Sequence, residues 1–223
     1  MISINTNNGG LFAAKAASQS QATIDSAMQR LSTGSRINNA KDDAAGQAIA
    51  TRLTAEIQGL EIASRNVADG QSLVDTAEGA LQETHTLLLR MREIGVQAAN
   101  GTLSTSDNQA LDAEFQQLVK EIDRIAQNTT WAGAALLNGN ATGAEDSTAT
   151  FSFQAGVGNN SGADVFSVTV KNADATTLDV FVANASDATV NDVNLLSQSS
   201  AGSAITAVDT AIATVSSERA NLG

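Results

Sequence analysis

The chain has 223 residues and a formal net charge of −12 at pH 7, from 12 basic and 24 acidic side chains. No run of Lys or Arg interrupts this acidity, which excludes the basic surface that nucleic-acid-binding proteins use. Cysteine and proline are both absent, so disulfides and thiolate metal sites are excluded and long helices lack their strongest breaker.

The sequence pattern also lacks the usual signals for secretion and membrane insertion. Residues 1–30 show no basic stretch followed by an apolar one, so we expect no signal peptide of the general secretory type. No apolar run approaches the roughly 18–20 residues of a membrane helix, so we expect no membrane insertion. Aromatic residues make up only 3% of the chain. Such an aromatic-poor, alanine-rich composition favours closely packed helices.

A thin apolar stripe predicts the first helix. Its positions follow steps of three and four residues: Leu11, Ala14, Ala17, Gln21, Ile24, Met28 and Leu31. This alanine-rich face buries too little apolar area to hold a helix by itself, so the helix needs a partner. Turn-forming residues from Ser32 to Asp43 end the segment.

A much longer stripe predicts a second helix that begins near Ala44. Its positions are Ile49, Leu53, Ile57, Leu60, Ser64, Val67, Leu73, Ala77, Ala80, Thr84, Leu87, Met91, Ile94 and Ala98. From Leu60 the steps alternate between three and four, apart from one longer step across Gly70, which is typical of a coiled-coil seam. Gly70 and Gly79 leave open whether this segment is one helix or two.

The rest of the chain predicts a return helix, a β region and a last helix. A turn at Gly101–Asp107 and a capping-box pattern at Ser106-x-x-Gln109 precede a stripe of Leu111, Phe115, Leu118, Ile122 and Ile125. Between 138 and 192 the residues alternate as in short hairpins, in three runs. These runs are Phe151 and Phe153; Val165, Phe166, Val168 and Val170; and Leu178, Val180 and Val182. Helical spacing then resumes at Ile205, Val208, Ile212 and Val215.

Together these elements predict a mainly α fold. We expect a long, antiparallel, coiled-coil-like helical rod or bundle with a small β-hairpin region. Leu111, Leu118, Ile122, Leu87 and Met91 are expected to share one buried seam with residues 205, 208 and 212. Rods of this kind usually serve as pieces of larger assemblies.

Several long segments in a fixed order carry a family resemblance. They are INTN at Ile4–Asn7, RLSTGSRINNAKDDAAGQAIATRL at Arg30–Leu53, SRNVADGQSLVDTAEGALQE at Ser64–Glu83, LRMREIGVQAANGT at Leu89–Thr102, EIDRIAQNTTWAGAALLNG at Glu121–Gly139 and AVDTAIATVSSERANLG at Ala207–Gly223. On these segments the chain resembles the bacterial flagellins.

The resemblance implies a structural subunit of the bacterial flagellar filament, which self-assembles by coiled-coil packing and serves motility. It implies that residues 1–43 form a filament-core segment, 44–138 a helical rod domain, 139–200 a short variable β segment, and 201–223 the start of a C-terminal rod helix. It also implies unfolded export through the flagellar type III apparatus with a chaperone, and a secreted, flagellar location.

The resemblance further implies that the C-terminal helix of the family, which would pair with residues 11–31, is missing after Gly223. We therefore expect residues 1–40 to be disordered or loosely docked.

The sequence shows no catalytic, cofactor-binding or metal site. His85 is the only histidine, and Asp42-Asp43 is best interpreted as a polar turn. By resemblance, Arg90, Ile94 and Glu114 match the patch that Toll-like receptor 5 contacts in flagellins. The alternative is that Arg90 and Glu114 are solvated surface charges used in subunit packing.

Two other function classes are the alternatives to a filament subunit. A flagellin-like cell-surface protein would use the β segment to bind a glycan or another ligand, and electron microscopy of filaments would distinguish it from a filament subunit. Some flagellins carry a metalloprotease in the middle segment, but that activity needs an HExxH motif, which this sequence lacks, so we expect no enzyme.

Overall fold

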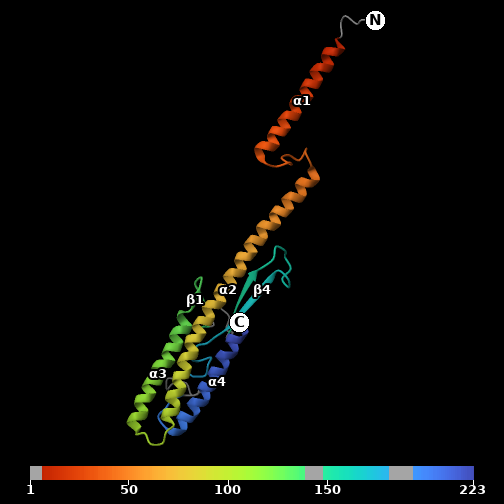
Figure 1. Ribbon diagram of the computed structural model, residues 1–223. Coiled ribbons are helices and arrows are strands. Elements are labelled where there is room, and N and C mark those ends of the chain that lie inside the picture. Colours follow the sequence, from red (N-terminus) through yellow and green to blue (C-terminus); the bar gives the residue numbers. More distant parts are fainter. Residues whose placement is uncertain (1–6, 139–147, 181–192) are drawn as a thin grey trace. The chain divides into compact units, whose positions relative to one another are not determined.

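The computed structural model describes residues 7–138, 148–180 and 193–223 (Figure 1). Its helices are α1 (Asn8–Thr33), α2 (Ala44–Ala98), α3 (Thr105–Asn128) and α4 (Gln198–Leu222). Its strands are β1 (Thr130–Trp131), β2 (Ala134–Ala135), β3 (Thr148–Gln154) and β4 (Val165–Lys171). The mainly α fold with a small β region is therefore confirmed. The chain divides into two compact units, Met1–Gly59 and Leu60–Gly223. The predicted segment boundaries at 43, 138 and 200 stay predictions.

The first unit contains α1, a turn and the start of α2. The Asn7 side chain accepts a hydrogen bond from the Gly10 backbone nitrogen at 2.9 Å and caps α1. The helix ends where Gly34 takes a left-handed conformation (φ 67°) that glycine adopts without strain. No residue of α1 is buried, so the helix rests on local hydrogen bonds and on no core of its own.

The long second helix is continuous through both glycines. At Gly70 an added Cβ would lie 2.7 Å from Phe166 Cζ and 3.3 Å from Phe153 Cδ2. These two phenylalanine rings stack with their centroids 5.2 Å apart. Asn66 adds a hydrogen bond from Nδ2 to the Gln154 carbonyl oxygen at 2.9 Å. Gly70 therefore does not break the helix but lets the β3–β4 hairpin approach its backbone.

The core of the second unit is a seam between α2, α3 and α4, which lie side by side in Figure 1. In α4 the buried positions follow steps of three and four: Ala201, Ala204, Val208, Ala211, Val215 and Glu218. Met91, Ile122 and Val208 are fully buried, as the spacing predicted. The prediction of full burial is wrong for five residues, which lie at the edges of the seam and are half-buried: Leu87, Leu111, Leu118, Ile205 and Ile212. The buried positions are their sequence neighbours, among them Leu88, Val119, Ala204 and Ala211. Alanine fills many core positions, which lets the helices pack closely.

The start of α3 differs from the prediction. The capping box joins Ser104 and Asp107, and the predicted pair Ser106 and Gln109 is wrong. Ser104 Oγ accepts from the Asp107 nitrogen at 3.2 Å, and Asp107 Oδ2 accepts from the Ser104 nitrogen at 3.0 Å. In the usual capping box the third helical residue is Glu or Gln. Here it is the shorter Asp107, whose carboxylate still reaches the Ser104 backbone nitrogen.

Within the described residues, the β region contains two antiparallel hairpins. In the larger one, β3 pairs with β4 from Thr148↔Lys171 to Gln154↔Val165, which confirms two of the three predicted runs. The smaller hairpin, β1–β2, turns through Ala132 and Gly133, both with positive φ. The third predicted run is wrong at Leu178 and Val180, which are not in a strand. Its last member, Val182, lies outside the described residues. The Leu178 and Val180 nitrogens bond back to the carbonyl oxygens of residues 174 and 175, which closes a turn.

Two aspartates of α3 hold backbone segments that are far away in the sequence. Asp123 Oδ1 accepts a hydrogen bond from the Ala175 nitrogen at 2.9 Å. Asp112 Oδ1 accepts one from the Leu195 nitrogen, also at 2.9 Å. Ala175 and Leu195 are themselves fully buried, so both segments are fixed against α3 by a polar and an apolar contact.

Replacing Gly70 with alanine is expected to lower the free energy of unfolding by about 1–2 kcal/mol, because the new methyl group would collide with the Phe166 ring. The matched control is Gly79→Ala, where nothing lies within 4 Å of the added carbon. That variant should be more stable by about 0.5–1 kcal/mol through helix propensity. Denaturant unfolding followed by circular dichroism measures both. A Gly70→Ala variant as stable as Gly79→Ala would contradict the tight packing.

Candidate functional site

Large apolar side chains are exposed mainly along one stretch of the chain. Among the described residues, eleven of the fifteen exposed large apolar side chains lie between residues 11 and 67. They are Leu11, Phe12, Ile24, Met28, Leu31, Ile49, Leu53, Ile57, Leu60, Ile62 and Val67. We call them the exposed apolar segment. Phe12 is 80% exposed and Leu31 85%. Apolar surface of this extent on a protein usually marks a place where another chain binds.

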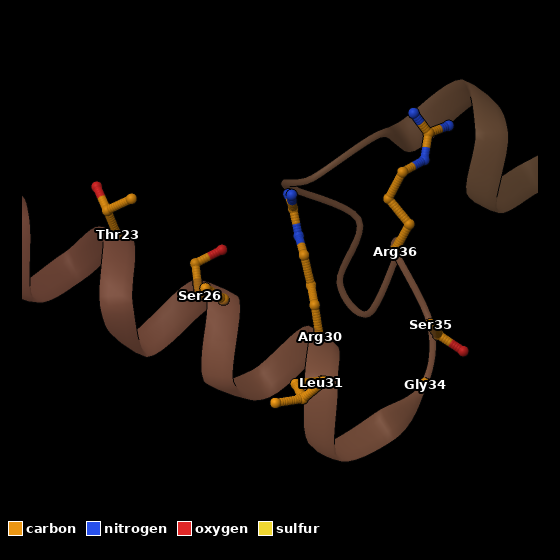
Figure 2. Close-up of a pocket in the computed structure, with 8 residues that line it drawn as sticks. Thr23, Ser26, Arg30, Leu31, Gly34, Ser35 and Arg36 are labelled. Carbon is orange, nitrogen blue, oxygen red and sulfur yellow. The ribbon is translucent and has the colours of Figure 1, made fainter.

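A groove lies at the end of α1, inside the first unit. It has a volume of about 510 Å³ and is lined by Thr23, Ser26, Ala27, Arg30, Leu31, Gly34, Ser35 and Arg36. We call it the arginine groove. Figure 2 shows Arg30 rising from α1 and Arg36 from the segment beyond Gly34, with both side chains directed to the same side. No ion pair among the described residues includes either guanidinium group.

The turn between α1 and α2 is held by two carboxylates. Asp42 Oδ2 accepts hydrogen bonds from the backbone nitrogens of Asn38 at 3.3 Å and Asn39 at 3.1 Å. These bonds, first from Asn38 and then from Asn39, lower the pKa of Asp42, and the charges of Arg30 and Lys41 lower it further. Asp43 Oδ1 accepts from the Gly46 nitrogen at 2.8 Å at the start of α2. The predicted polar turn at residues 42–43 is thus a capped turn.

The structure brings Arg90 and Glu114 together and separates Ile94 from them. Arg90 Nη2 lies 2.7 Å from Glu114 Oε1 and Nη1 lies 3.0 Å from Glu93 Oε2, on a surface that is about half exposed. The hydrogen bonds to Glu114 and then Glu93 raise the pKa of Arg90. Ile94 is only 1% exposed and belongs to the helical core. The surface patch therefore consists of three charged groups, with residue 94 beneath it.

Several ion pairs between elements were not predicted from the sequence. Arg92 Nε lies 2.6 Å from Asp209 Oδ1 and ties α2 to α4. Lys171 Nζ lies 2.6 Å from Glu218 Oε1, whose side chain is only 8% exposed. A signal for the second pair does exist, because residue 218 continues the buried spacing of α4 after Val215, and a carboxylate at a seam position requires a partner.

The described residues offer no sign of metal chemistry or membrane insertion. Over the described ranges, no group of three or more His, Asp or Glu side chains is arranged to hold a metal ion. None of the helices in those ranges has the length and apolar character to cross a membrane. His85, half-buried on α2, has no second histidine with which to share a ligand.

Comparison with known proteins gives a consistent result. The family described as "Bacterial flagellin N-terminal helical region" matches residues 4–142, which is more than half of the chain. Flagellin A of Vibrio anguillarum is 47% identical over 138 residues, a match that covers 62% of this chain and 36% of that protein. Phase 1 flagellin of Salmonella naestved is 50% identical over 135 residues, covering 60% of this chain and 27% of that protein. The match thus spans about a third of the relatives' length.

Solved structures agree with the sequence matches. The crystal structure of Bacillus cereus flagellin superposes with a TM-score of 0.55 at 34% identity, covering 71% of this chain and 81% of that one. The structure of FliC from Burkholderia pseudomallei gives a TM-score of 0.56 at 21% identity, covering 69% and 97%. Because its sequence identity is only 21%, the second match supports the fold alone.

Amide hydrogens from Leu11 to Leu31 are expected to exchange fast in the monomer, because no residue of α1 is buried. Amides around Phe115 and Ile122 in α3, which are fully buried, serve as the internal control and should be strongly protected. Hydrogen exchange measured by mass spectrometry compares the two segments. Protection of α1 equal to that of α3 would show that α1 has a partner within the monomer.

Acid should loosen the turn between α1 and α2. The folded-state pKa of Asp42 lies below its ordinary value of 3.8, so its stabilisation is complete above that value and is lost as the pH falls through the lower pKa. The Asn39 amide resonance, followed by NMR, should report this titration. Asp42→Asn should abolish it, whereas the control Asp25→Asn, on α1, should not. A signal that persists in Asp42→Asn would assign the titration to another group.

Proposed function

The chain belongs to the bacterial flagellin family, and we propose that it is a structural subunit that assembles with copies of itself into the filament of the bacterial flagellum. The observation that carries the proposal is the exposed apolar segment, which lies within the residues that match the family. A helix such as α1, with apolar side chains and no buried residue, is stable only when another helix covers it. Self-assembly supplies that cover.

The two units suggest different roles in the filament. In the first, residues 1–43 would form the filament core, because no residue of α1 is buried within the part of the chain that the structure describes. In the second, the three-helix seam is already complete, with α2, α3 and α4 burying their apolar faces on each other. Residues 44–138 and 201–223 would therefore form the rod part of the subunit, and the β segment at 139–200 would lie against it.

The location and the other partners follow from the same proposal. A filament subunit acts outside the cell, and we expect export through the flagellar type III apparatus with a chaperone. Unfolded export is compatible with a chain that has no disulfides to break. The patch of Arg90, Glu93 and Glu114 would be available to neighbouring subunits or to Toll-like receptor 5, whereas Ile94 would act by supporting the helix beneath it.

Antibodies against this chain are expected to label flagellar filaments along their whole length in the bacterium that makes it. Deleting the gene should remove filaments and swimming, as seen by electron microscopy and motility assays. Chromosomal replacement with Leu11→Asp, Ile24→Asp and Met28→Asp should have the same effect, because charge on the exposed apolar segment prevents helix pairing.

The matched control is Val157→Asp, an exposed apolar residue of the second unit outside that segment, 49% exposed. It should leave filaments intact. Ordinary filaments from the triple variant would refute the role given to α1, and the absence of label from filaments would refute the proposal as a whole.

A further inference from the structure

Charge is divided unequally between the two units. The first unit, Met1–Gly59, has five basic and four acidic residues, a net charge of +1. The second, Leu60–Gly223, has seven basic and twenty acidic residues, a net charge of −13. Copies of one chain that associate with the first unit of one against the second unit of another therefore gain electrostatic attraction, whereas second units placed side by side repel.

Two of the first unit's positive charges, which can attract the carboxylates of a second unit, lie together at the arginine groove. Arg30 and Arg36 are its only charged lining residues, and both are exposed. The neighbouring Asp42 and Asp43 carboxylates accept backbone hydrogen bonds in the turn and offset part of this charge, but with Lys41 the stretch from residue 30 to residue 43 keeps a net charge of +1. Guanidinium groups bind carboxylates in a planar, two-bond geometry that lysine cannot reproduce. The groove is thus suited to a carboxylate-bearing surface.

Most carboxylates of the second unit are already engaged. Five of its described acidic residues have neither an ion pair nor a side-chain hydrogen bond: Glu61, Asp69, Asp75, Glu83 and Asp179. Four of these five lie on α2. Arg65 lies one helical turn from both Glu61 and Asp69 and offsets their charge. Arg219 is committed to Glu78 and Gln82. On α2, Asp75 and Glu83 therefore remain as uncompensated charges.

The shape of this part of α2 also allows close approach. Asp75 and Glu83 are exposed and lie eight residues apart, about 12 Å along the helix axis. Gly79 lies between them, and nothing comes within 4 Å of the position where its Cβ would be. An apolar side chain such as Leu31, which lines the arginine groove and is 85% exposed, can pack there between the two carboxylates.

We propose that the arginine groove of one copy binds the Asp75–Glu83 face of α2 in a second copy. This inference rests on the proposed self-assembly and names one of its contacts. The contact joins Arg30 and Arg36 to two carboxylates and sets Leu31 against Gly79. It also gives the assembly a direction, because the groove and the acidic face lie in different units of the chain.

Charge reversal tests the contact. In purified full-length protein, Arg30→Glu with Arg36→Glu should weaken self-association roughly tenfold, as measured by sedimentation velocity at several concentrations. Asp75→Arg with Glu83→Arg should weaken it similarly, although that change lowers the net negative charge. The variant with all four substitutions should regain the association of the wild type. At an ionic strength of about 1 M, where charges are screened beyond roughly 3 Å, the differences should shrink.

The matched control is Arg52→Glu with Lys120→Glu, which changes the net charge of the chain by the same amount at exposed positions outside both the groove and residues 1–43. Circular dichroism confirms that each variant is folded. The control should associate within about twofold of the wild type, a difference of less than about 0.5 kcal/mol.

The outcomes separate this inference from the proposed function. A wild-type chain that stays monomeric under all conditions overturns self-assembly and the contact together. Equal association of wild type and Arg30→Glu/Arg36→Glu overturns the contact alone. So does tighter association of Asp75→Arg/Glu83→Arg, which would mean that general repulsion dominates. Saturable binding of inorganic phosphate at the groove without any effect of the reversals on association would assign it to a free anion.

Discussion

Close packing of small residues between three helices determines the geometry of the second unit. Ala77 on α2 and Ala204 and Ala211 on α4 are fully buried at seam positions. Small side chains allow the helix backbones to approach closely, while Phe115, Leu88 and Met91 fill the wider layers. The hairpin contact at Gly70, the α2–α4 ion pair and the anchored loops all require the helix positions that this seam sets.

Much of this arrangement could be predicted from local spacing, because a buried helix face repeats within a few residues. Leu73, Met91, Ile122 and Val208 were identified in this way and are buried. The cap of α3 was misplaced by two residues, since Ser104 and Ser106 offer the same chemistry and only the geometry of the turn selects one. The role of Gly70 could not be predicted, because the Phe166 ring that explains it lies far away in the sequence.

The candidate site likewise combines features that local spacing predicts with features that depend on residues far apart in the sequence. The need of α1 for a partner could be predicted from its thin apolar stripe, and the structure gives that helix no buried residue. The proximity of Arg90 and Glu114 is different, since residues on separate helices meet only once the turn between α2 and α3 reverses the chain. The arginine groove depends on the path of the backbone after Gly34, which no periodicity encodes.

The two aspartates on α3 have a consequence for how this chain can vary. Asp123 holds the backbone at Ala175 and Asp112 holds it at Leu195. These two points of the chain are therefore fixed against α3, whatever the length of chain between them. Closing a longer flexible connection costs little, about 0.6 kcal/mol for each doubling of its length. Leu178, Val180 and Val193 inside this stretch are buried too. Insertions of very different size placed between Val180 and Val193 can therefore be accepted without disturbing the helical seam, and foreign sequence can be grafted there for display.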